Sequence, residues 1–238
     1  MEESAALASG LGLEMTTATV LARRGLGDLE RCREFLAAKD DHPASAFEGI
    51  ELAVERVVQA DGVAATSILV GLLREAGATC DWFIPDRIAD GYGLNDDAIR
   101  SIASRGTGLV ITVDCGVASP EEVDLAKELG VSVVVTDHHL FGTVLPDCPI
   151  LHPVLSDYPF EGLAGAGVAA KFAIELRRAL DLDPSGNEAD LDLVALATVA
   201  DVMPLVDENR RLVREGIDVI RRARRTGMRA LLAEAGVE

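Results

Sequence analysis

The chain has 238 residues, which is enough for one large domain or two small ones. Apolar residues make up 49% and aromatic residues only 4%, so a core would consist mainly of Ala, Leu, Val and Ile. The formal net charge of −18 excludes a uniform attraction to nucleic acid, and any contact with DNA requires a local basic patch. The arginine-rich stretch 221–229 is one such patch, but a solvated helix end is the simpler interpretation.

The cysteines argue against a disulfide framework or a zinc ribbon. They lie far apart, form no CxxC pair and suit a reducing cytosol (Cys32, Cys80, Cys115 and Cys148). The N-terminus has no charged-then-apolar signal pattern, and no apolar run reaches the roughly 18 residues that a membrane span needs. We therefore expect a cytoplasmic protein without membrane contact.

The first third of the chain predicts helices. Residues 14–23 and 27–37 read as two short helices, and 46–60 reads as an amphipathic one. A further helix is expected over 61–77, where Gly77 would end it.

Apolar runs then alternate with helical patterns. We expect helices over 94–106, with Asn95 as the N-cap, and over 119–130, which opens with a Ser-Pro pair. The expected strands lie between and around these helices, and they are 80–84, 108–116, 131–137 and 149–153. Strands that are apolar throughout and alternate with helices indicate a parallel sheet covered on both faces.

The last third of the chain predicts only helices, over 164–180, 188–199, 208–223 and 227–235. The expected fold class is therefore α/β, with a parallel sheet flanked by helices and an all-helical C-terminal part.

Polar side chains follow two of the predicted strands where each strand ends. Asp114 follows "LVITV", and the run "VVVTDHHLFG" (133–142) delivers Asp137, His138 and His139. Binding sites of open parallel sheets form at the carboxyl ends of the strands. We therefore expect these side chains to lie close together.

Two more carboxylates stand at helix ends. Asp61 heads the predicted helix 61–77, and Asp201 ends an apolar helical stretch before Pro204. Oxygen ligands combined with one or two imidazoles suit Mn²⁺ or Mg²⁺ better than a thiolate-rich zinc site does. Each residue alone also has a structural interpretation: Asp61 as a helix cap, Asp114 as a turn residue and His138 as a core histidine. The adjacent histidine pair after an aspartate is harder to explain structurally.

Five motifs together closely resemble the DHH phosphoesterases. They are "VVTDHH", "ITVDCG", "IPDRIADGYGL", "GLAGAGVAAKF" and "LATVADVMPLVDENRRLV". Within this family they resemble the RecJ branch of 5′→3′ single-strand-specific DNA exonucleases, over roughly residues 15–237 and in the same order. The resemblance implies a two-metal phosphodiesterase that uses Mn²⁺ (or Mg²⁺) and acts on single-stranded DNA.

The resemblance also implies roles for the positions that match these motifs. Asp114 would bridge the two metals, and His138, Asp201 and Asp61 would complete the shell of one of them. His139 would lie beside the phosphate as an electrophile or proton partner. The catalytic set is thus Asp114, His138 and His139.

Three further positions are implied as substrate contacts. Arg87 in "IPDRIADGYGL" would bind a phosphate at the DNA end. Gly165 and Gly167 would allow the backbone to approach the site closely.

The first motif of the family departs from its usual form here. That motif is His-x-x-x-Asp-x-Asp-Gly at the end of a central strand, but Glu55 and Gln59 take the His and middle Asp positions, and only Asp61 and Gly62 match. The strand before the motif is missing, since "AVERVVQA" reads as helix up to Asp61, which looks like an excision of roughly a dozen or more residues. Either the protein truly lacks this strand, or its native sequence has a strand and loop at the Ala60–Asp61 junction that this sequence leaves out, and we favour the second. One metal position keeps four ligands and the other keeps only Asp114, so we expect impaired two-metal catalysis.

The expected domain organisation is a helical lead-in over 1–45 and a DHH phosphoesterase domain over 46–238. Within the latter, the parallel α/β core extends to about 153 and the helical part covers 160–238. The further α/β domain and OB-fold of RecJ-like enzymes do not follow in this sequence.

Three functions remain open. The first is a RecJ-like exonuclease domain. The second is a catalytically silent RecJ-like module that binds DNA or replication and repair proteins. The third is a DHH enzyme for short oligonucleotides or cyclic dinucleotides, and the RecJ-like motifs rank it last.

Overall fold

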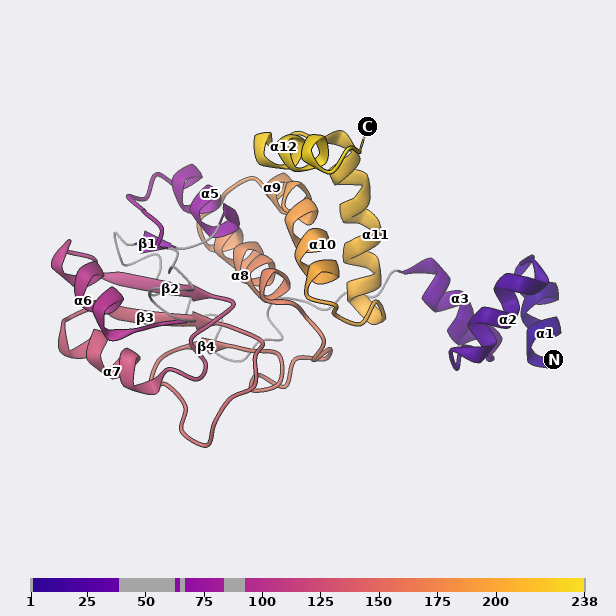
Figure 1. Ribbon diagram of the computed structural model, residues 1–238, viewed down its shortest axis with the longest axis horizontal. Helices are drawn as coiled ribbons and strands as arrows, with labels where there is room; N and C mark the ends of the chain where they lie inside the picture. The colour runs from indigo at the N-terminus through magenta and orange to yellow at the C-terminus, as the bar shows by residue number, and fades with distance from the viewer. Residues whose placement is uncertain (1, 39–62, 65–66, 84–92, 238) are drawn as a thin grey trace.

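The structure is a computed structural model that describes residues 2–38, 63–64, 67–83 and 93–237. It combines a small parallel sheet with helices on both faces and a helical C-terminal part, which confirms the expected fold class (Figure 1). The predicted helix over 46–60 lies outside the described residues. None of the helices in the described ranges is both long and apolar enough to cross a membrane.

The sheet has four parallel strands in the order β1-β2-β3-β4. The strands are β1 (Val63–Ala64), β2 (Leu109–Val113), β3 (Ser132–Thr136) and β4 (Ile150–Leu151). β2 and β3 pair over their full lengths, from Leu109 opposite Ser132 to Val113 opposite Thr136. Both strands are rich in Val and almost fully buried, as expected for a sheet covered on both faces.

Helices pack on the two faces of the sheet (Figure 1). α6 (Asp96–Ser104) and α7 (Pro120–Glu128) share a core with residues of β2 and β3, including Val110 and Val133. α5 (Ser67–Glu75) and α8 (Gly165–Ala179) share the opposite core, around Phe172 and Ile111. The remaining C-terminal helices are α9 (Ser185–Ala189), α10 (Leu191–Ala200), α11 (Asp207–Arg222) and α12 (Thr226–Glu234).

The N-terminal helices form a cluster of their own beside α11 (Figure 1). They are α1 (Glu2–Leu11), α2 (Met15–Arg23) and α3 (Leu29–Ala37), and they bury Leu7, Leu21 and Cys32 among themselves. α1 was not predicted from the sequence. Arg210 and Arg214 of α11 donate hydrogen bonds to the backbone carbonyls of Phe35, Ala37 and Ala38, and so join the end of α3 to the rest of the protein.

The N-termini of α6 and α7 lie where the capping residue and the proline predicted them. The side chain of Asn95 accepts a hydrogen bond from the Ala98 N–H at 2.8 Å, which confirms Asn95 as the N-cap of α6. α7 begins with Pro120, as predicted, although the Ser119 side chain makes no capping hydrogen bond.

Three predicted elements were wrong in part. The helix predicted from 61 begins only at Ser67, because Val63 and Ala64 pair as a strand with Val110 and Ile111 and so satisfy the exposed edge of β2. The predicted strand 80–84 is not a strand over its described residues 80–83, where the Asp81 side chain instead accepts a hydrogen bond from the Trp82 N–H. The helix predicted over 188–199 is two helices, α9 and α10, which meet at Asp190.

Candidate metal centre

Asp114 stands directly after β2, at the carboxyl edge of the sheet. Its backbone is in the left-handed region, with φ 60°, and its N–H donates to the Thr136 carbonyl of β3 at 2.9 Å. Such a conformation is uncommon for a residue other than glycine and is typical of functional positions. The Asp114 carboxylate is half-exposed.

Asp137 anchors the loop that follows β3. It is 1% exposed, and its two carboxylate oxygens accept hydrogen bonds from the backbone N–H groups of Val117, His138 and His139. The Nδ1 of His139 also lies 2.8 Å from Asp137 Oδ1. Asp137 is therefore an internal support that fixes the two histidines rather than a ligand itself.

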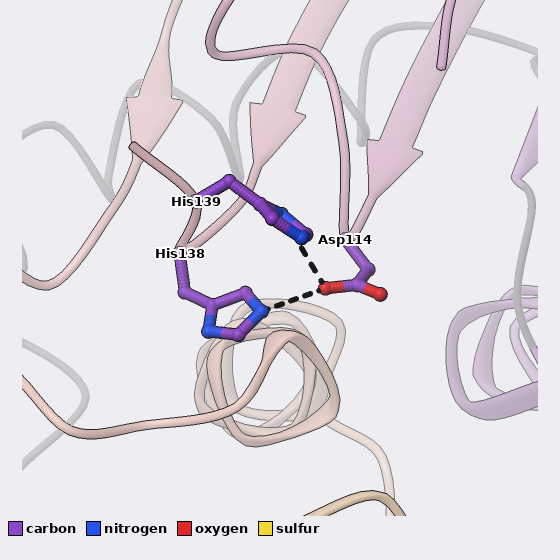
Figure 2. A group of neighbouring side chains, drawn as sticks. All are labelled: Asp114, His138 and His139. Carbon is purple, nitrogen blue, oxygen red and sulfur yellow. Dashed lines mark ion pairs between the residues drawn. The ribbon is translucent and has the colours of Figure 1, made fainter. Parts of the chain in front are cut away.

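The side chains of Asp114, His138 and His139 point toward one another at this edge (Figure 2). His138 Nε2 lies 2.9 Å from Asp114 Oδ1 and 3.5 Å from Asp201 Oδ2, and His139 Nδ1 lies 3.8 Å from Asp114 Oδ1. Asp201 caps the C-terminus of α10, so three separate elements bring these side chains together.

Gly165, the first residue of α8, lies against Asp114. A Cβ at Gly165 would come within 2.7 Å of Asp114 Cβ and 2.8 Å of its Cγ, which is closer than real Cβ contacts. Only glycine therefore fits here without displacing the Asp114 carboxylate. A Cβ at Gly167 would instead meet the Leu163 side chain at 3.2 Å, so Gly167 faces Leu163 and not the carboxylate.

His152 was not among the residues singled out from the sequence. It follows β4, is 1% exposed, and its Nε2 lies 2.8 Å from the His139 carbonyl oxygen. Its Nδ1 accepts the Val154 N–H at 3.2 Å, so the hydrogen of the neutral ring is on Nε2, which donates to His139. His152 stands at the same sheet edge as Asp114 and the histidine pair, and the strand-end rule applied to "PILHP" would have found it.

The negative charge of the cluster acts on His138. The close carboxylate of Asp114 raises the pKa of His138 above its usual value, against the opposing effect of burial, and Asp201 and Asp137 add to the rise. Burial, with Asp137 and Asp114 adding to it, raises the pKa of Cys115 to about 11. Without a bound metal, the Cys115 thiol therefore stays protonated at neutral pH.

The donor set fits a divalent cation. The Nε2 atom of His138 is buried. Asp114 Oδ1 lies only 2.9 Å away, but no atom in the described part of the chain forms a well-oriented hydrogen bond with this nitrogen. Asp114, His138 and His139 each offer one ligand atom within 4.8 Å of one another, and the Asp201 carboxylate lies beside His138. Carboxylate oxygens and an imidazole are ligands that Mn²⁺ accepts.

Asp114 and Asp201 also line a hollow of about 400 Å³. Its wall is otherwise apolar or small and comes from α5, α8 and α10, including Ile68, Ala166 and Ala197. The predicted ligand Asp61 and the predicted phosphate contact Arg87 lie outside the described residues.

Residues 52–198 match the family described as "DHH family, N-terminal domain". The single-stranded-DNA-specific exonuclease RecJ of Bacillus subtilis (strain 168) is 40% identical over 250 residues, which cover 97% of this chain and 31% of that protein. The RecJ of Escherichia coli (strain K12) is 37% identical over 238 residues, which cover 94% of this chain and 40% of that protein. The chain thus spans about a third of the length of the curated relatives it matches.

Solved structures agree with this similarity. The crystal structure of an exonuclease RecJ bound to manganese has a TM-score of 0.72 and 36% identity, covering 79% of this chain and 52% of that one. The structure of RecJ in complex with Mn²⁺ from Thermus thermophilus has a TM-score of 0.79 and 29% identity, covering 100% of this chain and 36% of that one. The chain belongs to the DHH family, and its relatives in that family are RecJ exonucleases.

Proposed function

We propose that this chain is a RecJ-like exonuclease domain that hydrolyses single-stranded DNA from its 5′ end with the help of Mn²⁺ or Mg²⁺. The observation that carries the proposal is the convergence of Asp114, His138 and Asp201 from β2, the loop after β3 and the end of α10. The names of the relatives and the Mn²⁺ in the solved RecJ structures support it.

In this proposal Asp114, His138 and Asp201, together with Asp61, hold one divalent cation. A bound cation would lower the pKa of a water and neutralise charge on the scissile phosphate. Asp114 keeps its carboxylate against Gly165, where no side chain competes for the space. The excess of negative charge that raises the pKa of His138 is the same charge that a cation would balance.

His139 acts beside the phosphate in this proposal. Its Nδ1 is 2.8 Å from the buried Asp137 Oδ1, so the hydrogen of the ring is held on Nδ1 and its orientation is fixed. A ring held in this way can polarise a phosphate oxygen or exchange a proton with it, as the resemblance implies. The ring is 42% exposed, which keeps it accessible to a substrate.

Impaired catalysis is part of the proposal. Glu55 and Gln59 stand where the family has His and Asp, so the second cation would have only Asp114. The alignment with the Bacillus subtilis RecJ extends over 250 residues, which is longer than the chain itself, so that relative carries residues that have no counterpart here. This observation favours a second function, a catalytically silent module that binds DNA or replication and repair proteins.

We further propose that residues 1–45 are a helical lead-in and that 46–238 are the DHH domain of a cytoplasmic protein. The separate core of α1–α3 around Leu7 and Cys32 supports the division. Asp61 and Arg87 keep their proposed roles as ligand and phosphate contact, and Gly165 takes the close-approach role, since Gly167 faces Leu163.

The test is Mn²⁺-dependent release of nucleotides from 5′-phosphorylated single-stranded DNA, compared with a dinucleotide substrate. We expect the chain to bind the strand and to release nucleotides slowly or not at all, with any release lost in Asp114→Ala. Asp147→Ala, an exposed carboxylate beside Lys127, is the matched control and should behave as the parent. Hydrolysis of the dinucleotide without binding of the strand would overturn the proposal.

A further inference from the structure

A second hollow adjoins the metal centre. It has a volume of about 820 Å³ and lies between α5, α10 and the segment that carries Trp82. Four of its lining residues also line the 400 Å³ hollow that contains Asp114 and Asp201, and these are Ile68, Ala166, Ala197 and Ala200. The two hollows therefore meet along a wall of small and apolar side chains, and together they form one groove that begins at the metal centre.

Trp82 lines the far part of this groove. It is the single tryptophan of the chain, and 52% of it is exposed. A large indole surface in contact with water is unfavourable unless something covers it. The guanidinium of Arg74 lies 5.5 Å from the centre of the Trp82 ring and holds a cation beside the indole.

The far part of the groove is positively charged, which is the opposite of the net charge of the protein. Arg74 is the only charged side chain among the described residues that line the far part, whereas the chain as a whole carries −18. An aromatic ring, a cation and an apolar floor are the features with which proteins bind single-stranded nucleic acid. The ring stacks on a base and the cation contacts a phosphate.

We propose that Trp82 and Arg74 form a nucleotide subsite in this groove, where an unpaired base stacks on Trp82 and a neighbouring phosphate contacts Arg74. The inference rests on the proposed function, because the strand that fills the subsite is the one that reaches the metal centre. A base within a duplex cannot stack on Trp82 without leaving its partner, so the subsite also selects for single strands.

The test uses the fluorescence of the single tryptophan, which reports on Trp82 alone. A short 5′-phosphorylated oligothymidylate is titrated into the full chain without divalent metal, so that hydrolysis cannot interfere. Anisotropy of a labelled copy of the same strand measures the affinity independently. We expect saturable quenching of the fluorescence over the concentration range in which the strand binds.

Variants separate stacking from a general effect on folding. Trp82→Ala should weaken binding by about tenfold or more, and Trp82→Phe, which keeps a smaller ring, should weaken it less. Arg74→Ala should weaken binding and lower the salt dependence by about one phosphate contact. Leu129→Ala, at the exposed end of α7, is the matched control and should bind as the parent does. Thermal unfolding shows whether each variant is folded.

The outcomes distinguish the subsite from the proposed function. Equal binding by the parent and Trp82→Ala, or binding without quenching, overturns the subsite and leaves the exonuclease proposal intact. Quenching with a loss of affinity in Trp82→Ala, but no nucleotide release even after the first motif is restored, supports the subsite and overturns the exonuclease proposal. A parent chain that does not bind the strand overturns both.

Discussion

Two clusters of charged side chains lie at opposite ends of α10 and differ in how their charges are balanced. At its N-terminal end, Arg225 contacts Asp190 and Asp192, while Arg177 lies 4.0 Å from Asp190 and 2.6 Å from Glu75. At its C-terminal end, Asp201 and Asp114 converge on the imidazole of His138, and His139 Nδ1 lies 3.8 Å from Asp114 Oδ1. The first cluster contains its own cations, whereas the second has an excess of carboxylates.

This difference separates a cluster that is neutralised within the fold from one that is not. The carboxylates of Asp190 and Asp192 are 9% and 3% exposed and are paired with arginines, which offsets the free-energy cost of burying them where α9, α10 and α12 meet. The carboxylates of Asp114 and Asp201 are 55% and 51% exposed and converge on a buried nitrogen without a well-oriented partner in the described part of the chain. A cluster of this kind is suited to a cation that comes from solution.

Restoring the first motif should have the largest effect. A variant with a strand that ends in His-x-x-x-Asp-x-Asp-Gly before Val63 gains the ligands of the second cation, and each cation contributes several kcal/mol to catalysis. We expect Mn²⁺-dependent nucleotide release to rise by about a hundredfold or more, measured on 5′-phosphorylated single-stranded DNA. Robust release by the unaltered chain would contradict this account.

Removing the guanidinium of Arg225 from its cluster with Asp190 and Asp192 should destabilise the fold but leave metal binding unchanged. Arg225→Met leaves Asp190 and Asp192 buried with less compensation, which should lower the free energy of unfolding by about 3 kcal/mol. Chemical denaturation measures the loss. Arg224→Met, the exposed neighbouring arginine, is the matched control and should change little.

The same variant should show a defined pH dependence. Burial raises the pKa of Asp190 in the folded parent, although Arg225 acts against it. Without Arg225 the folded pKa of Asp190 rises further above its unfolded value, so the protonated folded state is favoured at low pH. The deficit of Arg225→Met relative to the parent should therefore shrink as the pH falls through the folded pKa of Asp190, and a deficit that grows on acidification would contradict the assignment.

His152 offers a smaller, indirect effect on the metal centre. Its Nε2–H donates to the His139 carbonyl, so His152→Phe should loosen the histidine loop and weaken Mn²⁺ binding by about tenfold. His152→Gln can place an N–H near the same carbonyl and should recover most of the affinity. Equal Mn²⁺ affinities of His152→Phe and His152→Gln would contradict a role of this hydrogen bond in Mn²⁺ binding.

A substitution at Val202 should have the smallest effect, and it should stabilise the protein. It follows Asp201 with φ 56°, a left-handed conformation that is strained for a β-branched residue, and its side chain is 87% exposed. Val202→Gly should therefore raise the free energy of unfolding by about 1 kcal/mol. Val199→Gly, inside α10, should lower it by about the same amount.

The parallel sheet and the convergence of Asp114 and His138 could be predicted from the sequence. Apolar runs fix β2 and β3, and the rule that sites form at the carboxyl ends of strands is enough to bring Asp114 and His138 together. β1 could not be predicted, because Val63 and Ala64 become a strand only through pairing with β2. The predicted strand at Trp82 does not form. The Trp82 N–H donates to the Asp81 side chain, and this local hydrogen bond competes with backbone pairing between strands.

The most direct test of the central claim is a calorimetric titration of Mn²⁺ into the parent, Asp114→Ala and Arg225→Met. We expect one tight site in the parent, its loss in Asp114→Ala and its retention in Arg225→Met, since the proposed cation binds at Asp114 and not at the cluster of Arg225, Asp190 and Asp192. Mn²⁺ binding by Asp114→Ala that equals binding by the parent would contradict the assignment of this cluster as the metal centre.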